Sequence, residues 1–134
     1  MTLIKVKDPE SLAKAYVELT MQSEPAKNVE RGGADLRKLD EAGTKFELVI
    51  TYTVKAGRFS KEKTVIAVIP VSRVANGVLQ MDVNNVTFRS LAFKKGNFEE
   101  EWSGSLSEAQ SQFPDLVKVF ETDIKNLVAK FPSN

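Results

Sequence analysis

Apolar and polar positions alternate most regularly in the stretch that follows Lys45. Every second residue there is apolar, namely Phe46, Leu48, Ile50, Tyr52 and Val54. A period of two is typical of a β-strand with one buried face and one mostly polar face. A second strand is expected over residues 64–71, where odd and even positions are both apolar, as is typical of a strand covered on both sides. Pro70 has no backbone N–H to donate to a neighbouring strand, so it predicts a bulge, a bend or a sheet edge near the end of that strand.

Turn residues downstream predict further antiparallel strands. Asn76 and Gly77 form the strongest short signal for a hairpin. Asp82, Asn84 and Asn85 predict another turn over residues 82–85, and a short strand is expected near the start of the chain at residues 3–6. The remaining strands are expected over residues 78–83, 86–93 and 98–102.

Helical spacing occurs towards both ends of the chain. A helix is expected over residues 9–22, because Asp8 suits a helix cap, Pro9 suits the first helical position and an acidic residue follows. Residues 105–108 match a capping box, and after Pro114 the apolar residues recur on one side of a long amphipathic helix that Pro132 ends. The residues on that side are Leu116, Phe120, Ile124, Leu127 and Phe131.

The stretch between the first helix and the alternating strand is polar and uneven. Pro25 and the pair Gly32–Gly33 predict a loop there. Residues 34–42 predict a short helix that carries Leu36 and Leu39.

These elements predict a single α+β domain over residues 1–134. It has an antiparallel sheet of about five to six strands, an N-terminal helix and a long C-terminal amphipathic helix packed across the sheet. The order resembles helix-grip folds, in which a curved sheet wraps a C-terminal helix; the resemblance concerns topology and implies no activity. Because one helix covers one face of a sheet, the first helix, a partner or a second copy must cover the other.

Composition narrows the classes of function. The chain of 134 residues has 19 Lys and Arg residues and 18 Asp and Glu residues. A dedicated duplex-DNA binder needs a clear basic excess to neutralise phosphates, and this chain has none overall. Histidine and cysteine are both absent, which removes Ser–His and Cys–His nucleophile pairs and the commonest zinc ligands. We therefore expect no enzyme, no catalytic residues, no metal site and no cofactor, and keep a carboxylate-dependent enzyme as a third alternative. No apolar run has the length of a signal peptide or a membrane span, so a soluble, cytoplasmic protein is expected.

The first functional hypothesis is a non-enzymatic binding or adaptor domain. It would use an apolar surface or pocket between the sheet and the C-terminal helix to hold a protein partner, a second copy of the chain in a homo-oligomer or an apolar small molecule. A filled core is the alternative use of the same aromatic side chains. The residues expected to contact the ligand or partner are Phe88, Leu91, Phe93, Trp102, Phe113 and Phe120.

The alternative hypothesis is a single-stranded nucleic-acid-binding protein, because bases stack on aromatic faces while cations track phosphates. Its candidate residues are Arg58, Phe59, Lys61, Lys63, Arg89, Lys94 and Lys95. Residues 99–101 are three glutamates that balance the three basic residues of the preceding strand and turn, so we expect a charge-paired hairpin there. The loop near Phe59 has a local basic excess and is the better candidate for an anion-binding surface. Loop lysines of this kind are, however, more commonly exposed to solvent without binding a ligand.

Overall fold

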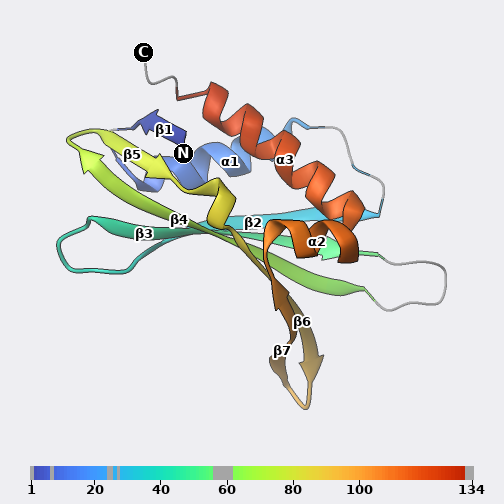
Figure 1. The fold of residues 1–134 in the computed structure, drawn as a ribbon. Coiled ribbons are helices and arrows are strands. Elements are labelled where there is room, and N and C mark those ends of the chain that lie inside the picture. Colours follow the sequence, from blue (N-terminus) through green and yellow to red (C-terminus); the bar gives the residue numbers. More distant parts are fainter. Residues whose placement is uncertain (1, 7, 24–25, 27, 56–61, 132–134) are drawn as a thin grey trace.

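The computed structural model describes residues 2–6, 8–23, 26, 28–55 and 62–131 (Figure 1). Its strands are β1 (Thr2–Lys5), β2 (Val29–Lys38), β3 (Lys45–Val54), β4 (Lys63–Ala75), β5 (Val78–Met81), β6 (Thr87–Lys94) and β7 (Asn97–Gly104). Its helices are α1 (Glu10–Met21), α2 (Leu106–Gln112) and α3 (Pro114–Ala129), with a 3-10 turn, η1 (Val83–Asn85), between β5 and β6. The α+β class is therefore confirmed, with an N-terminal helix and a long C-terminal helix.

The described strands form one antiparallel sheet in the order β1-β5-β4-β3-β2, with β6 and β7 joined to it through β4. β4 is long enough to hold two partners along one edge: its first half pairs with β6 and its second half with β5. Pro70 lies in the gap between these two partners, and its carbonyl oxygen accepts a hydrogen bond from the Asp82 N–H at 2.9 Å. The residue that lacks an N–H thus stands where β4 changes partner, as its chemistry requires.

The predicted alternation along β3 is confirmed, because buried and half-buried residues alternate from Phe46 to Val54. The buried side chains of β3 face those of β4 in register, from Phe46 opposite Val71 to Tyr52 opposite Val65. With the buried residues of α1 and α3 they form one apolar core. The predicted capping box is also present, since Ser105 Oγ accepts from the Glu108 N–H and the Glu108 carboxylate accepts from the Ser105 N–H.

Two predictions for the segment before β3 were wrong. Residues 34–38 belong to strand β2 instead of a short helix, because they pair with β3 from Ala34 opposite Ile50 to Lys38 opposite Phe46. Gly32 and Gly33 are a β-bulge inside β2, and a Cβ on Gly32 would lie 2.9 Å from the Thr51 carbonyl oxygen. Pairing with a long neighbouring strand has overridden the weak local signals, which is common for strands.

All the helices that the structure describes lie on one side of the sheet (Figure 1). α1 packs beside β2 and against α3, and α2 packs against α3 and the β6–β7 pair. The first helix therefore leaves the second face of the sheet open, and the β6–β7 hairpin projects away from the helices on that second side (Figure 1). Among the described residues, no helix is both long and apolar enough to cross a membrane.

Candidate functional site

A buried polar cluster lies where α1, β2, β3 and α3 meet. We call it the polar network, and it consists of Tyr16, Arg31, Tyr52 and Asp123. The Asp123 carboxylate is 1% exposed and accepts from Arg31 in a bidentate pair, with Nε to Oδ2 at 2.8 Å and Nη2 to Oδ1 at 3.0 Å. Bidentate arginine–carboxylate pairs of this kind are both strong and directional.

The two tyrosine hydroxyls complete the polar network. Tyr16 OH donates to Asp123 Oδ2 at 3.0 Å, and the Tyr16 and Tyr52 hydroxyls lie 2.8 Å apart. Because a hydroxyl has one proton, Tyr52 must donate to Tyr16 in this arrangement. Every member of the network therefore has a partner, which is the condition under which buried polar groups stabilise a unique core.

Burial determines the protonation of the tyrosines. It raises the pKa of Tyr16 far above the ordinary value, and the adjacent Tyr52 and Asp123 raise it further. Burial also raises the pKa of Tyr52, while the hydrogen bond to Asp123 raises the pKa of Arg31. Both phenols therefore stay neutral hydrogen-bond donors to pH values well above the ordinary tyrosine pKa of about 10.

The sequence held one signal for this network that our reasoning missed. Asp123 stands three residues after Phe120 and beside Ile124, on the apolar side of α3, where a carboxylate must be paired. Its partner Arg31 is 92 residues earlier in the chain and belongs to the segment predicted as a loop.

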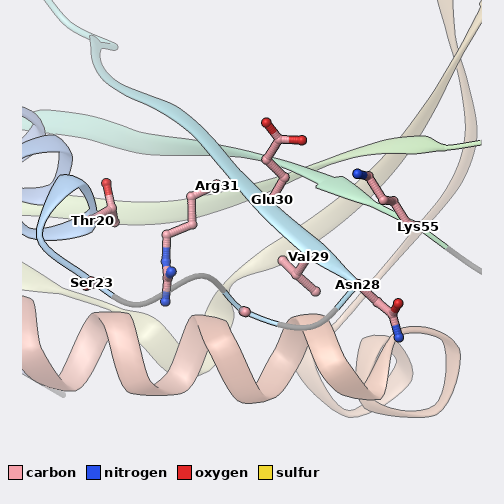
Figure 2. Close-up of a pocket in the computed structure, with 8 residues that line it drawn as sticks. Thr20, Ser23, Asn28, Val29, Glu30, Arg31 and Lys55 are labelled. Carbon is pink, nitrogen blue, oxygen red and sulfur yellow. The ribbon is translucent and has the colours of Figure 1, made fainter.

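A hollow of about 450 Å³ opens beside Arg31, and we call it the Arg31 hollow (Figure 2). Arg31 reaches from β2 towards α3, while the neighbouring Glu30 extends from the other side of the strand (Figure 2). Asn28, immediately before β2, has a positive φ of 63°, a conformation that asparagine tolerates better than most residues. The hollow is lined by Thr20, Ser23, Ala26, Asn28, Val29, Glu30, Arg31 and Lys55.

A second hollow, of about 430 Å³, shares Asn28 and Lys55 with the first and continues to the start of α3. Phe113 and Lys63 both line it, although the sequence analysis assigned them to different functions. Asn28 Nδ2 donates to Asp115 Oδ2 across its edge at 3.4 Å.

The structure distributes the predicted apolar contact residues over three places. Phe88 and Phe120 meet edge to face at 5.1 Å with no exposed surface, so they fill the core. Trp102 and Phe113 form a second edge-on pair at 5.6 Å and are half-buried. Leu91 lies opposite Thr64 on the other face of the sheet, and the side chain of Phe93 falls outside the described part of the structure.

The predicted basic residues are likewise dispersed. Arg58, Phe59 and Lys61 lie outside the described residues. Arg89 pairs with Glu100 at 2.6 Å, and Lys63 and Lys94 each lie 3.8 Å from Glu101. The expected charge-paired hairpin is therefore confirmed, and Lys95 occupies its turn with a φ of 51°.

The face of the sheet opposite the helices carries a group of half-buried apolar side chains. We call it the uncovered face, because no described helix crosses it, and define it by the apolar residues Val49, Ile66, Val68 and Leu91 together with Thr51. Val49 lies opposite Val68, and Thr51 lies opposite Ile66, in the β3–β4 register. Charged residues border this apolar centre, with Asp35 on β2 at one side and Arg89 on β6 at the other.

Family models, curated proteins and solved structures were compared with this chain, and none matches. The candidate sites are the polar network with the Arg31 hollow beside it, and the uncovered face. Within the described residues, no group of three or more acidic side chains is placed to hold a metal ion.

The polar network predicts an abnormal alkaline titration. The chain has two tyrosines, and both belong to the network. Because the folded state raises the pKa of both phenols, their burial stabilises the fold below about pH 10, the ordinary tyrosine value, and this stabilisation is lost as the pH rises further. We expect the near-ultraviolet absorbance of tyrosinate to stay flat in the folded chain well above that pH.

The same chain in strong denaturant is the control, and both tyrosines should then ionise with a midpoint at about pH 10. A native titration that coincides with the denatured one would mean that the phenols are not buried in the network.

Proposed function

We propose that this chain is a non-enzymatic binding or adaptor domain that docks a protein partner on the uncovered face. The observation that carries the proposal is the placement of every described helix on one side of the sheet. A sheet face that bears apolar side chains without a covering layer is a common site of association.

The chemistry of the polar network supports a non-enzymatic role. Its carboxylate accepts from a bidentate arginine and from a tyrosine hydroxyl. A general base needs an available proton acceptor near the substrate, whereas this carboxylate is 1% exposed and fully engaged. We therefore assign the network a role in stabilising the fold, and we assign docking to the uncovered face.

A second copy of the chain fits the uncovered face best. β2 and β6 flank the β3–β4 centre on opposite sides. A two-fold axis parallel to the strands would lay β2 of one copy over β6 of the other. Asp35 would then approach Arg89 on both sides of the interface and share its guanidinium with Glu100, the partner of Arg89 within the chain at 2.6 Å. Val49 would then pack on Val68 and Ile66 at the centre, as in stacked sheets.

The other expected partners have less support. Arg89, Lys63 and Lys94 already face glutamates, so a nucleic-acid phosphate would meet both signs of charge at the hairpin. A preformed apolar pocket under α3 is disfavoured because Phe88 and Phe120 have no exposed surface.

Self-association of the purified chain tests the proposal. We expect sedimentation to report a dimer with a dissociation constant on the order of micromolar, as for interfaces of modest size. Ile66→Lys should weaken dimerisation by at least about tenfold, because it would bury an unpaired ammonium at the centre of the interface. Gln110→Lys is the matched control, since it adds the same charge at an exposed position on α2, on the helix side of the sheet.

Two outcomes would contradict docking through this face. The chain would remain monomeric at concentrations far above that constant, or Ile66→Lys and Gln110→Lys would have equal effects. Tight binding of a single-stranded oligonucleotide that weakens steeply with salt would instead favour the alternative function.

A further inference from the structure

We propose that the β6–β7 hairpin is an arm that holds a second copy of the chain, with Phe98 of the arm packed on Met21 of that copy. The arm acts in the dimer of the proposed function, so it rests on docking through the uncovered faces and adds a contact outside them. Met21 is 80% exposed and Phe98 is 61% exposed, the highest values among the large apolar side chains that the structure describes. Single exposed apolar residues are ordinary, so the significance of these two depends on where they lie.

The arm projects towards the side of the sheet that carries the uncovered face (Figure 1). Leu91, which belongs to that face, lies opposite Glu100 in the β6–β7 register. Phe98 stands two residues before Glu100 on β7, and side chains two residues apart on a strand share a face. Because the arm turns towards that side of the sheet, Phe98 faces the space that a docked copy would occupy.

The arm and Met21 lie at the same end of the sheet. The start of β2 pairs with the end of β3, which pairs with the start of β4, where Leu91 of β6 also pairs. The arm continues beyond Leu91 and so extends past this end. The C-terminal part of α1 lies here too, because Thr20 and Ser23 line the Arg31 hollow together with the start of β2. Met21 is the last residue of α1.

The two-fold axis parallel to the strands brings the arm and Met21 together. Rotation about this axis keeps every feature at the same end of the dimer, exchanges the β2 and β6 sides and turns both helix layers outward. The arm of one copy therefore lies beside the β2 edge of the other copy and points towards its helix layer. α1 packs beside β2 in that layer, so its last turn is the part of the second copy that the arm meets.

The turn of the arm supports a role in contact. Lys95 and Gly96 have positive φ values of 51° and 84°, as in the two-residue hairpin turns that favour asparagine before glycine. The turn itself therefore does not account for a lysine at this position. Glu18 is exposed on α1, three residues before Met21, so Lys95 of the arm would approach a carboxylate of the second copy.

Disulfide formation between two variants tests the contact directly. The chain has no cysteine, so only introduced thiols can react. We would mix Met21→Cys with Phe98→Cys under mild oxidation and quantify the covalent heterodimer by mass. The control mixes Val74→Cys with Phe98→Cys, since Val74 is 51% exposed but lies near the far end of β4. We expect at least about tenfold more heterodimer from the first mixture, because a disulfide requires Cα atoms within about 7 Å.

The outcomes separate the arm from the proposed function. Equal yields from the two mixtures, in a chain whose dimer is weakened by Ile66→Lys, would overturn the arm and leave docking on the uncovered face in place. A chain that stays monomeric in sedimentation would overturn both.

The affinity of the dimer tests the energetic role of Phe98. Phe98→Ser should weaken dimerisation by at least about tenfold, because an aromatic anchor in an interface contributes more than most contacts around it. Leu39→Ser is the matched control, since Leu39 is 51% exposed and follows the far end of β2. Equal effects of the two substitutions would contradict the arm.

Discussion

The arrangement of this protein depends on one buried ion pair, between Arg31 on β2 and Asp123 on α3. Two tyrosines extend it, so that Tyr16 connects α1 and Tyr52 connects β3 to the same carboxylate. A buried charge that loses its partner costs about 3–5 kcal/mol, which is a large share of the stability of an ordinary domain. The positions of α1 and α3 relative to the edge of the sheet are therefore coupled to one another through Asp123.

This constraint determines what the rest of the surface can do. Both long helices are held on the side of the sheet that Arg31 faces, and the opposite side is left with half-buried apolar residues on β3, β4 and β6. The pair also places a fixed guanidinium at the wall of the Arg31 hollow. The same interaction thus fixes which side of the sheet the helices occupy and one wall of the hollow beside Arg31.

The amino-acid pattern predicted the elements that are defined locally. The alternation after Lys45 gave β3, and the capping box at Ser105 gave the start of α2. β2 was missed because its stability comes from pairing with β3, while its own residues are charged and interrupted by Gly32 and Gly33. The candidate site was missed for a related reason: the apolar surroundings of Asp123 show that it is buried, but not that its partner is 92 residues away. The predicted aromatic contacts lie apart, because the face that each side chain occupies depends on strand register.

A double-mutant cycle on Arg31 and Asp123 measures the central interaction most directly. Urea unfolding would give the free energy of unfolding for the parent chain, for Arg31→Met, for Asp123→Leu and for the double variant. We predict a loss of about 3–5 kcal/mol for Asp123→Leu, which strands the arginine, and a double variant that recovers at least about 2 kcal/mol relative to the sum of the single losses. Additive losses, or single losses below about 1 kcal/mol, would contradict the account.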